Sequence, residues 1–306
     1  MGDDQAGAHE QLLAPFSVWD GRAAGLSRSA LRSRTFEAPF HGVRVPAGYV
    51  RSTADLCRAA ATVLPPGAAF SHVTALRLHG IEVPWRLAGD DRIHVVTRER
   101  RLRPQRADVV AHFCGQRALD VTTAGSLPVT SPAQTLLHLS NTLSLEDVVV
   151  LADCMTRRRR PATTLAALRD LVGATHKMRG LVRCREALDL AVEGTDSSLE
   201  TRTRLLLLDA GLPCPRVNVA AYDDVGRFLA LPDLSYPELR IAIEYDGDVH
   251  RSDPATWRRD VERRQRLEDA GWLIITATAD DVLRHPGRLV HRVRRARARR
   301  GALGTP

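Results

Sequence analysis

The stretch of residues 232–250, PDLSYPELRIAIEYDGDVH, limits what this chain can fold into more than any other part of the sequence. Residues 237–239, PEL, are a turn signal between two strand-like runs, so the stretch predicts a β-hairpin. Glu244 and Asp246 share one face of the returning strand, because side chains alternate along a strand. Asp233 lies on the first strand, across the hairpin from these two acids. The hairpin therefore predicts a cluster of carboxylates at one end.

A helix expected over residues 197–210 carries Glu200, which could approach the same point. Clustered carboxylates repel one another, so burying them costs free energy unless a cation neutralises them. Mg²⁺ takes oxygen ligands, polarises a phosphodiester and lowers the pKa of a bound water. Just past the turn 246–248, His250 is placed for a general acid/base or water-positioning role. The alternative is that these groups are exposed at strand ends and bind nothing. The candidate catalytic residues are Glu200, Asp233, Glu244, Asp246 and His250, and the candidate metal ligands are Asp233, Glu244 and Asp246.

A wider set of residues forms one pattern with the hairpin: Glu200, residues 232–234, residues 243–250, Trp257, Arg258, Asp260, Arg263, Leu267, Gly271 and Trp272. In this pattern the segment 198–300 resembles the very-short-patch-repair endonucleases, within the PD-(D/E)xK restriction-endonuclease-like group. The resemblance implies that Asp233 and Glu244 bind Mg²⁺ or Mn²⁺, and that Glu200 is the acid of the first helix. It covers roughly the last third of the chain and implies a nuclease domain.

The pattern departs from that group at one position. Asp246 stands where the group usually has a lysine that assists the attacking water, and an aspartate cannot supply a positive charge. His250 or Arg258 are the residues that would substitute for it. If neither does, the domain would bind DNA without cutting it.

The charge balance favours a polyanion as partner. The chain has 44 Lys and Arg against 36 Asp and Glu, which gives a net charge of +8 and a pI of about 9.9. Arginine binds phosphate with two parallel hydrogen bonds, so we expect DNA as the partner. Arg258, Arg259 and Arg263, on a helix expected over residues 254–270, are candidate contacts, and residues 288–300 add more arginines. Alternatively, a genome whose composition favours arginine codons over lysine codons explains the excess of arginine, and the basic C-terminus is a solubilising helix end.

Residues 23–27, AAGLS, break the chain as in a helix–turn–helix, with Ser27 as the N-cap of a second helix through residues 30–32. Arg28 and Arg32 are its candidate DNA contacts, and residues 40–46 alternate as a wing strand would. Together with residues 71–75, SHVTA, and 127–135, LPVTSPAQT, the pattern is similar to AbiEi-type antitoxin domains of type IV toxin–antitoxin systems. That resemblance implies a winged helix that reads DNA. The alternative is an ordinary helical cap that contains glycine.

The middle of the chain mixes strands with helices. Residues 92–97 and 109–113 alternate as strands. Ser131 and Pro132 open a helix, with Gln134 completing a capping box. Further helices are expected over residues 145–156, 164–171 and 180–192. The arginine run 157–160 is interpreted as a solvated helix end, with contact to phosphates as the alternative. The expected domains are a disordered tail (1–10), a winged-helix-like DNA-reading module (11–50), an AbiEi-like α+β region (51–194) and a nuclease domain (195–306).

Several other classes of protein leave no trace in the sequence. The chain has 5 cysteines and no CxxC, so neither a zinc ribbon nor a disulfide framework is indicated. A glycine-rich phosphate loop, a GxSxG motif and zinc-protease histidines are absent from the sequence. The acidic N-terminus is not a secretory signal, and no apolar run approaches the length of a membrane span. We therefore expect a cytoplasmic protein with no membrane partner, and leave open whether it forms a homodimer.

The expected fold class is α/β. A C-terminal restriction-endonuclease-like domain, with a mixed central sheet flanked by helices, would follow a mainly helical region that contains a winged helix. The expected function is Mg²⁺-dependent hydrolysis of DNA phosphodiester bonds in bacterial defence or repair. One alternative is a catalytically inactive DNA-binding transcriptional regulator or antitoxin-like protein, and another is a scaffold that uses the fold without nucleic acid.

Overall fold

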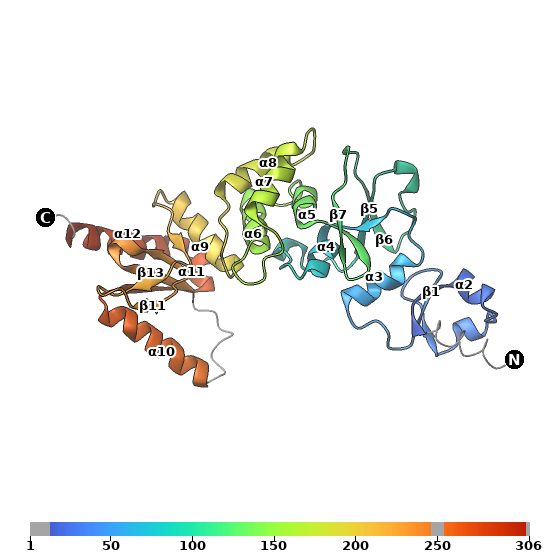
Figure 1. The fold of residues 1–306 in the computed structure, drawn as a ribbon, viewed down its shortest axis with the longest axis horizontal. Helices are drawn as coiled ribbons and strands as arrows, with labels where there is room; N and C mark the ends of the chain where they lie inside the picture. The colour runs from blue at the N-terminus through green and yellow to red at the C-terminus, as the bar shows by residue number, and fades with distance from the viewer. Residues whose placement is uncertain (1–12, 246–253, 304–306) are drawn as a thin grey trace. The chain divides into compact units, whose positions relative to one another are not determined.

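The computed structural model describes residues 13–245 and 254–303. The chain divides into two compact units: the first contains the chain up to Leu143 and Ala167–Arg185, and the second contains Ser144–Ala166 and the chain from Glu186 onward. Helices and mixed sheets occur in both, so the protein belongs to the expected α/β class (Figure 1). Within the described ranges, no helix has the length and apolar character needed to span a bilayer.

The N-terminal end of the first unit is a small antiparallel sheet. Its strands are β1 (Phe16–Ser17), β3 (Val43–Pro46) and β2 (Phe36–Glu37), in that order. A single short helix, α2 (Val18–Ala23), follows β1. Strand β3 takes up the second half of the run 40–46 that alternates in the sequence.

The second helix expected after Ser27, through residues 30–32, is present only as a short 3-10 turn. The hydroxyl of Ser27 does accept a hydrogen bond from the backbone N–H of Ala30 at 3.1 Å, but the chain forms only a 3-10 turn, η2 (Ala30–Arg32). Ser33 already has an extended backbone, with φ −69° and ψ 165°, so the 3-10 turn ends after Arg32. Arg28 and Arg32 are exposed around this turn and not on a full helix.

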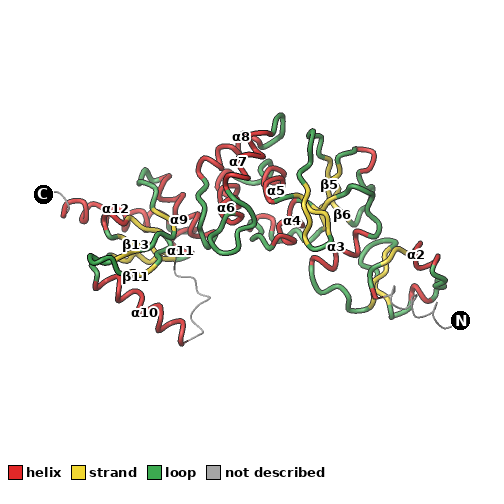
Figure 2. The backbone as a smooth tube through the Cα atoms, in the orientation of Figure 1, coloured by secondary structure: helices red, strands yellow, loops and turns green. Residues whose placement is uncertain are grey.

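A five-stranded sheet forms the centre of the first unit (yellow strands around β5 and β6 in Figure 2). The strand order is β6-β5-β4-β8-β7, with β5 and β6 parallel and β7 antiparallel to β8. Strands β5 and β6 confirm the two strands predicted from alternation in the sequence. One face of each strand is hydrophobic and packs into the core. The strands are β4 (Ala69–Phe70), β5 (Ile93–Thr97), β6 (Val109–Phe113), β7 (Val121–Ala124) and β8 (Leu127–Thr130).

Helices α3 (Thr53–Ala61), α4 (His72–His79) and α5 (Pro132–Leu139) belong to the same unit as this sheet. Helix α5 starts as expected, since Pro132 is its first residue and the Ser131 hydroxyl accepts from the Gln134 N–H at 3.1 Å. The expected capping box is wrong. The Gln134 side-chain oxygen accepts instead from the backbone N–H of Asp120 at 3.3 Å, because the neighbouring loop supplies a competing donor.

Three helices follow that match the predicted ones to within a few residues: α6 (Leu145–Met155), α7 (Leu165–Ala174) and α8 (Leu181–Leu190). Two short 3-10 turns lie earlier in the chain: η3 (Trp85–Leu87) lies between α4 and β5, and η4 (Arg100–Leu102) lies between β5 and β6.

The second unit is built on a four-stranded mixed sheet of order β14-β13-β12-β9. Strand β13 is parallel to β14 and antiparallel to β12, and β12 is antiparallel to β9. The predicted hairpin is confirmed as β12 and β13, joined through the 3-10 turn η5 (Pro237–Leu239), and β10 and β11 form a separate hairpin. The elements are α9 (Ser198–Asp209), β9 (Arg216–Val217), β10 (Ala221–Tyr222), β11 (Phe228–Ala230), β12 (Leu234–Tyr236), β13 (Ile241–Tyr245), α10 (Pro254–Asp269), β14 (Leu273–Ala277), α11 (Ala279–Leu283) and α12 (Pro286–Leu303).

Helices cover both faces of this sheet (Figure 1). Ile241 and Ile243 point into one core, against side chains of α9 and α12 such as Leu207 and Leu289. Ala242, between them, points to the other face, where Leu267 of α10 packs. The alternation along β13 therefore carries through to the next residue, Glu244, which lies on the α10 side.

A buried ion pair joins helices α6 and α9. Arg204 donates to the Asp153 carboxylate at 2.7 Å, and the two side chains are 1% and 0% exposed. The backbone N–H of Val192 and the hydroxyl of Thr201 donate to the same carboxylate at 2.8 and 2.9 Å. Since α9 also carries Glu200, this network fixes the helix that supplies an acid of the candidate site.

Candidate metal and nucleic-acid site

Glu200 occupies the first turn of α9. Its backbone N–H donates to the Ser197 hydroxyl at 3.2 Å, which fixes the start of the helix. The side chain turns back, so that its carboxylate accepts from the N–H of Asp196 at 2.9 Å and from the Asn218 amide at 3.2 Å. The carboxylate is buried against this end of the sheet.

Asp233 and Glu244 meet across the hairpin, as the sequence predicts. Asp233 comes directly before β12, and its carboxylate accepts a hydrogen bond from the backbone N–H of Tyr245 at 2.8 Å. This bond ties the start of β12 to the end of β13, next to the buried Glu244. The structure thus brings Glu200, Asp233 and Glu244 together from one helix and two strand ends.

The electrostatics of the cluster reflect burial and mutual repulsion. Burial, and next to it the negative charge of Asp233, raise the pKa of Glu200 to about 7. Burial also raises the pKa of Asp233 to about 6, with a further increase from Glu244, while the Tyr245 hydrogen bond acts in the opposite direction. A nearby cation stabilises the charged form of carboxylates in this state.

Arginines of α10 provide cations at this point. The Arg263 guanidinium forms a two-pronged ion pair with Glu244, with an Nη2–Oε2 distance of 3.1 Å. The Nε of Arg264 lies 3.6 Å from the same carboxylate. Arg263 was expected to face the phosphate backbone, and it instead neutralises one of the predicted metal ligands. Sequence spacing could not show this pair, since it joins a strand to a helix that follows it.

A pocket of about 660 Å³ opens beside the cluster. Asp233 forms part of its wall, and Arg158 is held there by an Nε–Oδ2 hydrogen bond to Asp196 at 3.0 Å. The arginine run 157–160 was interpreted as a solvated helix end, yet three of its members line this pocket because α6 stops at Met155. The lining residues are Arg157, Arg158, Arg159, Asp196, Asn218, Phe228, Leu229, Ala230, Leu231, Asp233, Asp260, Arg263 and Arg266.

Several predicted site residues stay untested by the geometry. Asp246 and His250 lie outside the described residues. Arg258 and Arg259 belong to α10, but their side chains are outside the described part of that helix.

The basic C-terminal helix is partly engaged in structural contacts. Arg292 forms an ion pair with Asp281 at 2.7 Å, and Arg300 donates to the carbonyl of Gly271 at 2.9 Å. The Arg297 guanidinium lies over the Tyr236 ring, 4.2 Å from its centroid. These arginines anchor α12 to the sheet, so they are not all available to a phosphate backbone.

The cap at Ser197 permits a direct test of the helix start. We expect Ser197→Ala to lower the free energy of unfolding by about 1 kcal/mol, because the Glu200 N–H loses its acceptor. Urea denaturation measures this change. Ser126→Ala, at an exposed turn position, is the control and is expected to change stability by less than about 0.5 kcal/mol. Equal effects of the two substitutions would contradict the role of the cap.

The fold and this site define a mixed α/β protein whose second unit holds buried carboxylates beside an arginine-lined pocket. No protein-family model matches the chain. Two proteins of Mycobacterium tuberculosis are similar to it: "Uncharacterized protein MT2308" of strain CDC 1551 / Oshkosh and "Uncharacterized protein Rv2248" of strain ATCC 25618 / H37Rv. Each is 31% identical over 222 residues, which are 72% of this chain and 78% of the relative. The chain belongs to the family of these mycobacterial proteins.

Proposed function

We propose that this protein is a Mg²⁺-dependent or Mn²⁺-dependent DNA endonuclease whose active site is the cluster of Glu200, Asp233 and Glu244. The observation that carries the proposal is the grouping of the buried Glu200 and Glu244 with the half-buried Asp233, which lines a pocket together with arginines. The Asp233 carboxylate and the guanidinium groups that line this pocket suit a phosphodiester held near a hard cation. DNA is the proposed partner.

The residues present fit such an ion. Glu200 and Asp233 are carboxylates whose pKa values are raised by desolvation and by neighbouring negative charge, which is the condition that a divalent cation relieves. Asp233 and Glu244 would hold it, with Asp246 as a third proposed ligand. When bound, Mg²⁺ would polarise the phosphodiester and lower the pKa of the attacking water.

The chain's own groups supply binding and orientation. Arg157, Arg159 and Arg266 line the pocket and would bind the phosphates on either side of the reacting one. Glu200 accepts hydrogen bonds from the Asp196 N–H, just before α9, and from the Asn218 amide, just after β9, so it ties these two segments of the second unit together. The N-terminal arginines, Arg28 and Arg32, are exposed and would add DNA contacts away from the reaction.

The order of elements supports a restriction-endonuclease-like architecture for the second unit. A helix (α9), a strand hairpin (β12 and β13), a second helix (α10) and a strand parallel to the hairpin's second strand (β14) occur in this order, with β9, β10 and β11 between α9 and β12. The acids come from α9, from the start of β12 and from β13, which are the positions that the resemblance implies.

The alternative proposal is a DNA-binding regulator, antitoxin-like, without nuclease activity. The ion pairs of Glu244 with Arg263 and Arg264 favour it, because they neutralise a carboxylate that an ion would otherwise need. In that case the arginines replace the metal as the partner of the acid cluster, and the pocket binds phosphate without hydrolysis.

Plasmid cleavage distinguishes the two proposals. We expect the full-length protein to nick supercoiled DNA with Mg²⁺ or Mn²⁺, and a chelator to stop the reaction. Asp233→Asn and Glu244→Gln should abolish nicking while they keep DNA binding, because each removes one ligand charge from the metal site. Asp209→Asn, an exposed acid at the end of α9, is the matched control and should cleave normally.

The other outcomes are equally informative. DNA retention by every variant with no cleavage would favour the regulator over the nuclease. The absence of DNA binding even at low salt would contradict both proposals and leave the scaffold.

A further inference from the structure

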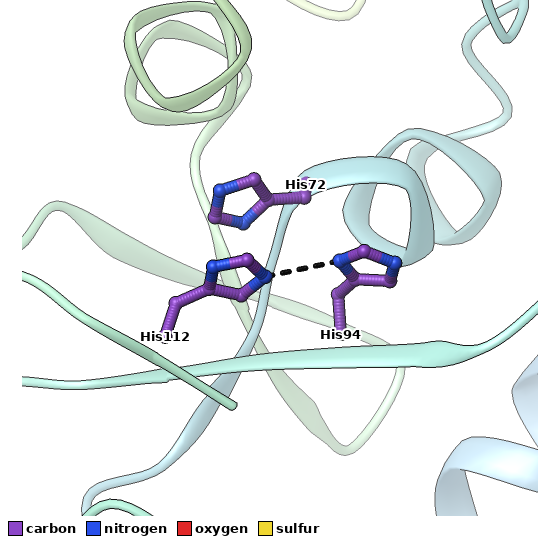
Figure 3. A group of neighbouring side chains, drawn as sticks. All are labelled: His72, His94 and His112. Carbon is purple, nitrogen blue, oxygen red and sulfur yellow. Dashed lines mark hydrogen bonds between the residues drawn. The ribbon is translucent and has the colours of Figure 1, made fainter. Parts of the chain in front are cut away.

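Four histidines from four separate elements lie together in the first unit. His72 begins α4, His94 is on β5, His112 is on β6 and His138 is on α5. The ring centroids of His72 and His112 are 3.7 Å apart, and those of His72 and His138 are 4.9 Å apart. Figure 3 shows the first three of them, with His72 stacked over His112.

The pairing of β5 with β6 explains how two of them meet. In the parallel register His94 is opposite Val110 and Val96 is opposite His112, so both histidines are on the same face of the sheet. Their ring nitrogens, Nδ1 of His94 and Nε2 of His112, are 3.0 Å apart (dashed line in Figure 3). The opposite face of these strands carries the apolar core.

The nitrogens of this group have the arrangement of a ligand set. One nitrogen from each of His72, His94 and His112 lies within 4.8 Å of the other two. Burial, and after it the neighbouring imidazoles, lower the pKa of His112 to about 4 and of His72 below its usual range. A neutral imidazole has the lone pair that binds a metal.

Outer partners orient two of the rings. The Asp90 carboxylate lies 3.1 Å from Nε2 of His94, and the Ser71 hydroxyl lies 3.0 Å from Nδ1 of His72. Each contact occupies one ring nitrogen. Nδ1 of His94 is already paired with Nε2 of His112, so a bound ion would replace that hydrogen bond. A carboxylate behind a ligating histidine is the usual way in which proteins fix the tautomer and raise the basicity of the ligand.

His138 contributes a fourth nitrogen. Its Nε2 accepts a hydrogen bond from the Gln134 amide at 3.0 Å. Its Nδ1 is buried and has no hydrogen-bond partner among the described residues. A buried polar atom without a partner is costly, so a group that it can bind nearby would offset this cost.

We propose that His72, His94 and His112 bind one transition-metal ion, with Zn²⁺ as the ion that three imidazoles suit best. Three histidines and an open position form a recognised zinc arrangement, and His138 is stacked beside His72. Imidazole selects Zn²⁺ and its neighbours in the transition series, whereas the carboxylates of the second unit suit Mg²⁺. The two sites are therefore chemically separate, and this proposal does not depend on nuclease activity.

The stacked geometry predicts a local rearrangement. The rings of His72 and His112 are inclined by only 16°, and the lone pair of an imidazole lies in the ring plane. Both cannot point at one ion while they are stacked, so we expect the His72 ring to turn out of the stack when the metal binds. The ion would then join the start of α4 to β5 and β6.

Metal titration of the full-length protein tests the proposal. After a chelator has been removed, we expect calorimetry to show one equivalent of Zn²⁺ bound, unaffected by excess Mg²⁺. Co²⁺ in its place should give the visible absorption of a four-coordinate site. Both signals should persist in the double variant Asp233→Asn, Glu244→Gln, which separates this site from the carboxylates.

Conservative variants locate the ligands. His94→Asn and His112→Gln keep a polar atom near the original nitrogen, and each should lower Zn²⁺ affinity by more than 100-fold. Asp90→Asn removes the charged outer partner of His94, together with the surface ion pair to Arg92, and should lower affinity by about 10–100-fold. His41→Gln, at an exposed position of the same unit, is the control and should bind normally.

The outcomes that oppose the proposal are specific. Absence of stoichiometric Zn²⁺ uptake by the wild-type protein would overturn it and leave four neutral rings that stack without an ion. Uptake that is equal in the wild type and in His112→Gln would also overturn it. Circular dichroism of each variant shows whether it is folded, and if His94→Asn unfolds, Asp90→Asn still decides the result.

Discussion

Asp153→Ala is expected to lower the free energy of unfolding by about 3–5 kcal/mol, the range for breaking a buried ion pair by removing one partner. The Arg204 guanidinium, whose side chain is 1% exposed, would be left buried without its carboxylate. The backbone N–H of Val192 and the hydroxyl of Thr201 would lose their acceptor at the same time. Because α9 begins at Ser198 and carries Glu200, the substitution would also loosen the acid cluster.

Urea denaturation checks this expectation, as a shift of the midpoint at constant slope. The double variant Asp153→Leu, Arg204→Met should recover the part of the loss that comes from the unpaired guanidinium, since apolar residues of similar volume replace both charges, while the Val192 N–H and the Thr201 hydroxyl still lack their acceptor. Glu99→Ala is the matched control: it breaks the exposed pair with Arg101, whose side chains are 50% and 82% exposed, and should cost less than about 1 kcal/mol. A loss in Asp153→Ala no greater than in this control would contradict the importance of the pair.

The hairpin shows how much of the site the sequence alone could predict. Alternation along residues 241–245 separates Ile241 and Ile243 from Glu244, and the structure has the isoleucines in one core and the acid on the other face. The turn at residues 237–239 brings Asp233 to the same end. Period and turn chemistry are local properties, so they can be inferred from a single sequence.

Contacts between distant segments could not be predicted in this way. The pairing of Arg263 with Glu244 depends on how α10 packs over the sheet. The histidines of the first unit come from four elements, and no spacing rule connects His72, His94, His112 and His138. The helix expected after Ser27 is only a 3-10 turn because the chain enters β2 before a second turn of helix can form, and this strand pairing is also a contact between distant segments.

The two proposals for the second unit share one requirement and differ in another. Both need phosphate to enter the pocket lined by Arg157, Arg159 and Arg266. Only the nuclease also needs Glu244 to exchange Arg263 for a metal ion. A test of DNA affinity at the pocket therefore examines the common requirement, whereas plasmid cleavage examines the difference.

The double variant Arg159→Ala, Arg266→Ala is expected to weaken binding to duplex DNA on the order of 30-fold at 0.15 M salt, if each arginine neutralises one phosphate. Both arginines are exposed and line the pocket, so neither has to leave a buried partner to reach DNA. The slope of log K against log salt should become shallower by about 2, because two fewer counterions are released. Fluorescence anisotropy over a series of salt concentrations measures both quantities.

A control must distinguish the loss of two positive charges anywhere on the protein from the loss of two arginines at the pocket. Arg101→Ala, Arg284→Ala removes the same charge from side chains that are 82% and 80% exposed and do not line the pocket, and should leave the slope nearly unchanged. Arg28→Ala, Arg32→Ala reports on the N-terminal module in the same way. If this last pair lost affinity while the pocket variant kept it, DNA would bind through the first unit, and the pocket would have no part in holding phosphate. A loss in the pocket variant alone would instead place the bound backbone over Asp233 and Glu244, where the proposed chemistry requires it.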